Sequence, residues 1–347
     1  MNRDQEWMSL ALKEAQKGIG RTAPNPAVGC VIVKDGVLLG SGWHRRAGMP
    51  HAEREAMAAV RNFHGDDALR GATAYVTLEP CSTHGRTPPC VDGLCDAGIS
   101  RVVYACADPN PAHAGAAKIM LESRGIAVTE GVCESETRYV LRHFAKVQKT
   151  GLPWVMVKMA MSLDGRITKA AGESPWLSGE ESLAVVQELR SECDLILTSG
   201  ETVRQDKPSL TIRRIELLEG RSQPWRMILT NHADRLPKDA PLLCDKYHHR
   251  TLIRGGSIED ALRGVATEHG VNSVMVEAGG KLNAGLLKLG LVDEVVIFLT
   301  PWITGGLPAV AGEFFPEMNL QQIIWRKCGD DLMLRALTSN GATFCNE

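Results

Sequence analysis

Three short segments within the first 90 residues carry side chains that together could bind a metal ion and move protons. They are Pro50-His51-Ala52-Glu53, Leu78-Glu79-Pro80-Cys81 and Pro88-Pro89-Cys90. One neutral imidazole and two thiolates make a reasonable set of zinc ligands, and three protein ligands leave a fourth position for water. We therefore predict a zinc site made of His51, Cys81 and Cys90, with Glu53 beside it.

The chemistry expected of such a site is hydrolysis by an activated water molecule. Zinc lowers the pKa of a bound water toward about 7, which generates hydroxide at neutral pH. Glu53 would accept the proton of that water and deliver it to a ring nitrogen and to leaving ammonia. His-x-Glu followed by Pro-Cys-x-x-Cys is typical of zinc nucleobase deaminases, but here eight residues separate Cys81 from Cys90. The alternative is a structural zinc with a fourth protein ligand, for which His44, His84 and Cys95 are the spare candidates.

The local sequence favours Cys90 over Cys95 as the second thiolate. Two prolines precede Cys90, and proline is favoured in the first turn of a helix. A thiolate in that turn meets the positive end of the helix dipole, which should lower its pKa. Cys95 follows five residues later, about 140° around the helix, and should face the core.

Two alternating series of helices and strands would position these and other residues. The first series has expected helices at 4–18, 52–61, 91–97, 113–123 and 134–148, and strands at 27–34, 37–42, 73–78, 101–105 and 126–129. The second has expected strands at 154–161, 194–198, 226–230, 273–276 and 294–300, and helices at 180–192, 257–268 and 281–289. Gly151-Leu152-Pro153 separates the two series as a helix stop. The pattern is typical of layered α/β domains, one over 1–147 and one over 148–347.

Composition narrows the class of protein. The chain has 347 residues, with 39 Lys and Arg against 41 Asp and Glu, a net charge of −2. A nucleic-acid partner is not expected, because such binders usually carry a clear positive excess. Apolar runs such as 27–33 fall far short of the roughly 20 residues of a membrane span. No signal peptide is visible, so we expect a cytoplasmic protein in which most of the ten cysteines are small buried residues.

Longer motifs resemble a known family along essentially the whole chain. They are Thr22-Ala-Pro-Asn-Pro-Ala-Val-Gly-Cys, Gly48-Met-Pro-His-Ala-Glu, Glu79-Pro-Cys-Ser-Thr-His-Gly-Arg-Thr-Pro-Pro-Cys, Lys158-Met-Ala-Met-Ser-Leu-Asp-Gly and Val276-Glu-Ala-Gly-Gly. This set is similar to the bifunctional deaminase–reductase of riboflavin biosynthesis, and the wide cysteine spacing is that family's own. The resemblance implies an α/β protein, with a cytidine-deaminase-like three-layer sandwich followed by a dihydrofolate-reductase-like α/β domain.

The same resemblance implies two consecutive reactions and two cofactors. The zinc-dependent first domain would deaminate 2,5-diamino-6-ribosylamino-4(3H)-pyrimidinone 5′-phosphate, and the second would reduce the ribosyl group of the product to ribityl with NADPH. Substrate contacts implied for the deaminase are Asn25, His44 and Arg86. Members of the family commonly carry His where this chain has Thr83, which puts a pyrimidine contact in doubt unless His84 replaces it.

For the reductase the resemblance implies two groups of residues. The cofactor group is Ala160, Trp176, Thr202, Asp206, Asn231 and the turn of Gly279, Gly280, Lys281, Leu282, Asn283, Ala284 and Gly285. The substrate group is Ser174, Arg190, Leu210, Arg213 and Glu277. Lys207 stands where the family often has Asp, and its charge could favour the 2′-phosphate of the cofactor.

Physical reasoning gives several of these residues a role of their own. The sequence around 274–285 reads as a strand, a glycine turn and a helix, whose N-terminus could approach a pyrophosphate. Arg190 and Arg213 could clamp a phosphate, because guanidinium binds it bidentately, whereas Arg214 is expected on a solvated face. Lys158 and Glu277 each follow an apolar run and could activate the sugar; the alternative is a mutual salt bridge.

Two other functions compete with the two-activity enzyme. One is a nucleic-acid base deaminase with an accessory RNA-binding domain, which the charge balance disfavours. The other is a reductase whose first domain keeps zinc for structure only, which the presence of Glu53 beside the ligands disfavours. The expected partner is thus a small phosphorylated pyrimidine, with neither nucleic acid nor membrane, and a homo-oligomer is left open.

Overall fold

The computed structural model describes residues 3–83, 88–110, 114–169, 177–312 and 317–346. Its elements form two units, Met1–Thr150 and Gly151–Cys345, called here the first and the second unit. The helix that ends the first unit, α5 (Glu134–Thr150), runs past the boundary expected at residue 147. Gly151 follows it with φ of 70°, a left-handed conformation that glycine adopts at low cost after a helix.

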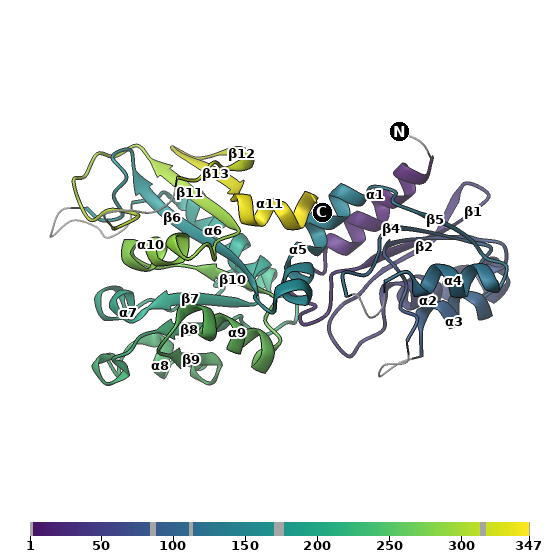
Figure 1. Ribbon diagram of the computed structural model, residues 1–347, viewed down its shortest axis with the longest axis horizontal. Coiled ribbons are helices and arrows are strands. Elements are labelled where there is room, and N and C mark those ends of the chain that lie inside the picture. Colours follow the sequence, from purple (N-terminus) through teal and green to yellow (C-terminus); the bar gives the residue numbers. More distant parts are fainter. Residues whose placement is uncertain (1–2, 84–87, 111–113, 170–176, 313–316, 347) are drawn as a thin grey trace. The chain divides into compact units, whose positions relative to one another are not determined.

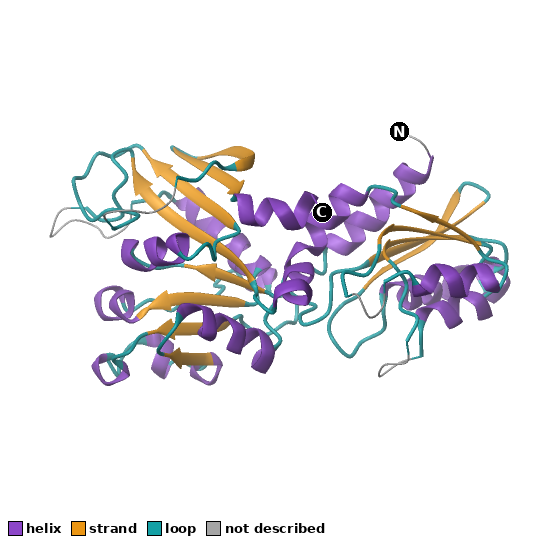
Figure 2. Cartoon of the chain, viewed as in Figure 1, coloured by secondary structure: helices purple, strands orange, loops and turns teal. Residues whose placement is uncertain are grey.

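The first unit is a five-stranded sheet between two layers of helices (Figures 1 and 2). The strand order is β2-β1-β3-β4-β5, with β1 antiparallel to its two neighbours and β3, β4 and β5 parallel. The bounds of its strands are β1 Gly29–Lys34, β2 Val37–Trp43, β3 Thr73–Leu78, β4 Arg101–Cys106 and β5 Ala127–Glu130. The expected hairpin turn is present, since Asp35 and Gly36 both have positive φ, as a tight two-residue turn requires.

Helices cover the two faces of this sheet through separate apolar cores. One core packs α2 (Ala52–His64), α3 (Cys90–Asp96) and α4 (Ala116–Ser123) against the sheet. The other packs α1 (Arg3–Gln16) and α5, through Met8, Ala11 and Leu141. A short 3₁₀ turn, Asp66–Leu69, follows α2. The two cores give the three layers that the sequence indicated.

The second unit is built on an eight-stranded sheet of order β12-β13-β11-β6-β10-β7-β8-β9. The strands from β11 to β9 in this order are parallel, and β13 and β12 continue the sheet antiparallel. The bounds are β6 Trp154–Ser162, β7 Leu195–Ser199, β8 Trp225–Leu229, β9 Thr251–Arg254, β10 Ser273–Val276, β11 Glu294–Thr300, β12 Gln321–Cys328 and β13 Asp331–Leu337.

The helices of this unit also divide between two faces. Apolar residues of α9 (Ile258–His269) and α10 (Gly280–Lys288) pack on one face. Those of α6 (Glu180–Glu192), α7 (Gly200–Asp206) and α8 (Pro241–Cys244) pack on the other. The last helix is α11 (Ser339–Asn346), and short 3₁₀ turns lie at Ile215–Leu217, Ala233–Arg235 and His248–Arg250. Among the described residues, no helix is both long and apolar enough to span a bilayer.

The prediction from sequence omitted several elements of the second unit, namely α7, α8, α11, β9, β12 and β13. The strand β12 shows why. Seven of its eight residues are exposed, so it lacks the alternation of buried and exposed side chains on which strand prediction rests. The short helices α7 and α8 have too few turns to show a helical period.

Candidate functional sites

The three predicted metal ligands meet at one end of the first unit's sheet. His51 is the residue just before α2, Cys81 follows β3, and Cys90 is the first residue of α3. The Nδ1 atom of His51 lies 3.5 Å from Sγ of Cys81 and 3.4 Å from Sγ of Cys90. Tetrahedral zinc with ordinary bond lengths places such a nitrogen and sulfur about 3.6 Å apart. The donor set and its spacing therefore fit zinc.

No fourth ligand joins this cluster within the described residues. The side chains that could hold a metal ion there are His51, Cys81 and Cys90 alone, with their ligand atoms within 4.8 Å of one another. Cys95 packs against the apolar core under α3, as expected, and His84 lies outside the described residues. Three ligands leave a position for water, which is the arrangement of a catalytic rather than a structural zinc site.

The backbone N–H at the start of α3 contacts Cys81 and not Cys90 itself, which corrects the prediction from the helix dipole. The first N–H group of α3, on Cys90, donates to Sγ of Cys81 at 3.2 Å. Hydrogen bonds from Cys90 and His51 lower the pKa of Cys81 to about 4. The pKa of Cys90 is instead raised, by its contact with the Cys81 sulfur and by burial. The helix terminus thus stabilises the thiolate of Cys81, and a cation is needed to ionise both.

Glu53 lies in the first turn of α2 with only 3% of its surface exposed. Burial raises the pKa of its carboxyl group, and the neighbouring Cys81 adds to the effect. A carboxyl group with a raised pKa gains and loses a proton more readily near neutral pH than an exposed one does. This geometry suits Glu53 for proton transfer.

Two of the predicted substrate contacts, Asn25 and His44, form a hydrogen-bonded chain beside the cluster. Nδ2 of Asn25 is 3.0 Å from Nε2 of His44, and Nδ1 of His44 is 3.0 Å from the carbonyl oxygen of Pro50. Since a carbonyl only accepts, Nδ1 carries the proton, and Nε2 accepts from Asn25. Burial lowers the pKa of His44, which keeps this neutral tautomer. Arg86 lies outside the described residues, and Thr83 is exposed.

Sequence reasoning missed Glu79, which anchors the segment that follows β4. Its buried carboxylate accepts three backbone N–H groups, from Asp108 at 3.2 Å and from Gly115 and Ala117 at 3.0 Å. Glu79 stands two residues before the ligand Cys81, so this anchor also restrains the ligand loop. An acidic residue directly after the strand Thr73–Leu78, which carries no charged side chain, was the available signal.

In the second unit the strand register places Lys158 and Glu277 at neighbouring positions. Val157 pairs with Val276 across β6 and β10, and the next residue on each strand is Lys158 and Glu277. Successive side chains alternate between faces, so both point to the face that α6 covers. Glu277 follows the end of β10, where its N–H donates to Leu197 of β7 at 2.9 Å.

The partner of Glu277 is Arg190, which overturns the alternative of a mutual salt bridge. Arg190 of α6 donates from Nε at 2.6 Å and from Nη2 at 3.1 Å to the two carboxylate oxygens, and from Nη1 to the carbonyl of Thr211 at 2.7 Å. Burial alone would raise the pKa of Glu277, but the charges of Arg190 and Lys158 hold it below its usual value.

Lys158 makes no hydrogen bond or ion pair with the described residues. Its Nζ atom lies 5.9 Å from the ring centroid of Phe298, and burial lowers its pKa. The other predicted phosphate ligand, Arg213, is exposed, whereas Leu210 is buried. Arg214 is a surface residue, paired with Glu216 at 2.7 Å, as expected.

The predicted glycine turn separates into an open and a buried side. Gly279 is the residue before α10, and a Cβ atom there would meet nothing within 4 Å. A Cβ atom on Gly280 would lie 2.2 Å from the carbonyl oxygen of Pro308. Asn283 is fully buried and donates from Nδ2 to the carbonyl of Ala309 at 3.0 Å. The open space at Gly279, at a helix N-terminus without a side-chain cap, fits the phosphate end of a dinucleotide.

The remaining predicted cofactor residues gather at the carboxyl ends of parallel strands. Thr202 donates its N–H to Ser199 Oγ at 3.1 Å after β7, and Asn231 accepts from Gly256 at 2.7 Å after β8. Ala160 is near the end of β6, and Asp206 ends α7. This edge is where open α/β sheets bind ligands. Lys207 pairs with Asp239 at 2.5 Å, while Ser174 and Trp176 lie outside the described residues.

Both units match the models of known protein families. Residues 1–106 match the cytidine and deoxycytidylate deaminase zinc-binding region, and residues 153–334 match the RibD C-terminal domain. The riboflavin biosynthesis protein RibD of Escherichia coli is 40% identical over 330 residues, which cover 87% of this chain and 89% of that protein.

Solved structures agree with the sequence comparison. A structure of Acinetobacter baumannii RibD superposes with a TM-score of 0.87 at 35% identity, covering 97% of this chain and 99% of that one. A diaminohydroxyphosphoribosylaminopyrimidine deaminase/5-amino-6-(5-phosphoribosylamino)uracil reductase from Thermotoga maritima superposes with a TM-score of 0.84 at 31% identity, covering 96% and 98%. The chain therefore belongs to the RibD family, the zinc- and NADPH-dependent bifunctional deaminase–reductases of riboflavin biosynthesis.

Proposed function

We propose that the two reactions divide between the two units and use the residues predicted from the sequence. The first unit would remove the 2-amino group of 2,5-diamino-6-ribosylamino-4(3H)-pyrimidinone 5′-phosphate. The second would reduce the ribosyl group of the product to ribityl. The observation that carries this proposal is the convergence of three zinc-spaced ligand atoms beside the buried carboxylate of Glu53. The name of the Thermotoga maritima relative supports this choice of substrates.

In the deaminase reaction, His51, Cys81 and Cys90 would hold zinc, which when bound supplies a water molecule acidified to a pKa of about 7. Glu53 would take up one proton of that water and deliver it to the ring nitrogen, and then take up the second proton and deliver it to the leaving amine, for which a carboxyl group with a raised pKa is suited. Asn25 binds the pyrimidine with its free carbonyl side, because Nδ2 is used by His44. Arg86 would contact the 5′-phosphate.

In the reductase reaction, NADPH supplies the hydride, and the chain orients the sugar. The Lys158 ammonium, which has no ion-pair partner among the residues that the structure describes, would lie beside the ring oxygen. The Glu277 carboxylate orients the hydroxyl groups, and together the two charges favour ring opening at C1′. The exposed Arg213 binds the 5′-phosphate. Arg190, with three of its N–H groups bound to Glu277 and Thr211, holds the carboxylate in place and has two N–H groups left for the substrate.

The cofactor would lie along the carboxyl edge of the parallel strands, over the open side of Gly279. We propose the remaining contacts as predicted: Ala160, Trp176, Thr202, Asp206, Asn231 and residues Gly280 to Gly285, with Ser174 and Leu210 on the substrate side. Gly280 and Asn283 would contribute by holding α10 against the Pro308–Ala309 backbone. We also propose the cytoplasm as the compartment, because free cysteines such as those of this chain persist in a reducing environment.

Both half-reactions should be assayed on the purified full chain, with bound zinc quantified. We expect about one zinc per chain, release of ammonia from the diaminopyrimidine phosphate, and NADPH oxidation that depends on the deaminated product. Zinc without ammonia release would indicate a reductase with a structural metal. Ammonia release from single-stranded DNA or tRNA, and not from the small substrate, would indicate a nucleic-acid deaminase.

A further inference from the structure

The segment Ser209–Arg213 crosses the second unit without regular secondary structure and in a strained conformation. Leu210, a non-glycine residue, has φ of 50° with its side chain 3% exposed. Such a left-handed residue costs on the order of 1 kcal/mol or more and persists only where the surroundings hold it. The segment carries Leu210 and Arg213, both in the proposed substrate group. What holds it therefore bears on the reaction.

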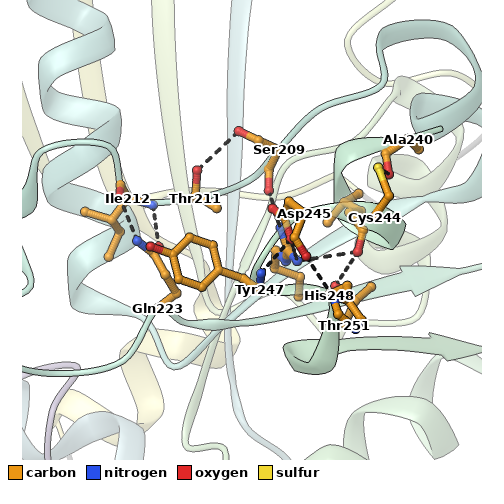
Figure 3. Close-up of polar contacts among 12 residues, drawn as sticks. Ser209, Thr211, Ile212, Gln223, Ala240, Cys244, Asp245, Tyr247, His248 and Thr251 are labelled. Carbon is orange, nitrogen blue, oxygen red and sulfur yellow. Dashed lines mark hydrogen bonds and ion pairs between the residues drawn. The ribbon is translucent and has the colours of Figure 1, made fainter.

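Gln223 holds the middle of the segment as a strand partner would. The N–H of Ile212 donates to Gln223 Oε1 at 2.7 Å, and Gln223 Nε2 donates to the carbonyl of Ile212 at 2.8 Å (Figure 3). The side chain of Gln223 is buried, with 5% exposure. A buried amide that satisfies both polar groups of one residue leaves that residue a single orientation.

An ion pair between a fully buried arginine and a partly exposed aspartate holds the start of the segment. Arg226, fully buried in β8, donates from Nη1 to the carbonyl of Ser209 at 2.9 Å. Asp245 accepts from Nη1 and Nη2 of Arg226 at 2.7 and 2.8 Å, and also from the N–H of Tyr247 at 2.9 Å (Figure 3). Taking the fully buried guanidinium of Arg226 out of water costs free energy, so stability alone gives little reason for a charged group at this position of β8.

Two further side chains complete the contacts and join the segment to the reductase site. Gln187 Oε1 accepts the N–H of Arg213 at 2.6 Å. Arg190 binds the carbonyl of Thr211 and, with its other nitrogens, the carboxylate of Glu277. The same guanidinium thus fixes both the segment and the residue proposed to orient the sugar.

We infer that Gln223 and the Arg226–Asp245 pair are positioning residues for the reduction. They fix the backbone of Ser209–Arg213 so that Leu210 is turned inward and the exposed Arg213 meets the 5′-phosphate of the substrate, without themselves touching it. This inference rests on the proposed function of the second unit. The 5′-phosphate would thus be recognised by the preorganised segment Ser209–Arg213. Gln223 just before β8, Arg226 in β8 and Asp245 just after α8 support this segment.

The test uses the full chain with Gln223→Met, which keeps the length of the side chain and removes both hydrogen bonds. Ser273→Ala is the matched control. Ser273 Oγ exchanges two hydrogen bonds with Asp194 at the amino ends of β7 and β10, and no hydrogen bond of the described residues joins either one to Ser209–Arg213. Both variants should lower the melting temperature, but only Gln223→Met should change substrate recognition.

For Gln223→Met we expect the KM of the phosphorylated pyrimidine to rise about tenfold, which corresponds to about 1.4 kcal/mol. NADPH affinity, measured by fluorescence titration, and deamination should be unchanged. With the dephosphorylated substrate the increase in KM should be less than about twofold, because only the contact with the phosphate depends on the segment Ser209–Arg213. Gln223→Glu, which keeps the acceptor for Ile212 N–H and loses the donor, should give an intermediate KM.

The double variant Arg226→Met/Asp245→Leu removes the charged pair together and leaves no orphan charge. It should fold and raise the same KM, because the carbonyl of Ser209 loses its donor. A wild-type KM in Gln223→Met and in the double variant, or an equal rise on the phosphorylated and dephosphorylated substrates, would overturn the inference. If the wild-type chain itself reduces neither substrate, the proposed function fails instead.

Discussion

The charged residues at the reductase site should respond to neutralisation in opposite ways. Lys158→Met keeps the aliphatic stem and removes a charge that has no ion-pair partner among the described residues. Glu277 retains Arg190 at 2.6 Å in this variant, so no carboxylate is orphaned. We expect the free energy of unfolding to change by less than about 1 kcal/mol or to increase, because burying an unpaired ammonium is unfavourable.

Glu277→Gln should be costly, because it leaves the buried guanidinium of Arg190 without its carboxylate. The side chains of Arg190 and Glu277 are only 10% and 13% exposed. Breaking a buried pair by removing one partner typically costs about 3–5 kcal/mol, and we expect about 3 kcal/mol since the amide still accepts one hydrogen bond. At about 2–4 °C per kcal/mol for a domain of this size, the melting temperature should fall by about 6–12 °C.

The assay combines thermal unfolding, NADPH titration and turnover on the full chain. The transition to follow is the one that NADPH shifts upward, since ligands stabilise only the unit that binds them. Both variants should keep NADPH affinity at a temperature where they are folded. Both should lose at least about 10²-fold in turnover, as is usual when one electrostatic contact to the transition state is removed.

The pH dependence gives an independent check on Lys158. Burial lowers its pKa in the folded state, so at pH values between the folded and unfolded pKa the unfolded chain binds more protons. The free energy of unfolding of the wild type, relative to that of Lys158→Met, should therefore rise with pH between the folded and the unfolded pKa of Lys158, up to about pH 10. A Lys158→Met variant that melts as low as Glu277→Gln, or that keeps wild-type turnover, would refute the reasoning.

Three further predictions concern the other parts of the chain. Glu53→Gln should keep zinc and reductase activity but lose about 10²–10⁴-fold in deamination, whereas Cys90→Ser should lose metal as well, by metal analysis; near-normal ammonia release from either would contradict the assigned role. Gly279→Ala should weaken NADPH binding without changing the melting temperature, while Gly280→Ala should destabilise the fold, since its Cβ would lie 2.2 Å from the Pro308 carbonyl oxygen; the reverse pattern would show that the cofactor lies elsewhere. A fragment of residues 151–347 should fold and bind NADPH without the first unit, and aggregation or loss of cooperative melting would count against independent units.

Much of the molecule could be predicted from local sequence. Apolar strands such as β3, β10 and β11 have the bounds expected of them, because a run of apolar residues between turn signals specifies a buried strand on its own. The metal ligands could be found in the same way. His51 immediately precedes α2 and Glu53 lies in its first turn, while Cys90 follows two prolines, so the local position of each depends on a few neighbouring residues. Strands without such a pattern, such as the exposed β12, were missed.

Other properties depend on which distant segments meet, and only the tertiary structure decided them. The contact made by the N-terminus of α3 is one: the N–H of Cys90 donates to Sγ of Cys81, which the spacing of the two residues does not reveal. The partner of Glu277 is another, since Arg190 lies 87 positions away and Lys158 is nearer in register. The support of Ser209–Arg213 by Gln223 and Arg226 is a third. A hydrogen bond needs a donor and an acceptor about 3 Å apart in the right direction, and that condition is set by the packing of whole elements, which residue types alone do not encode.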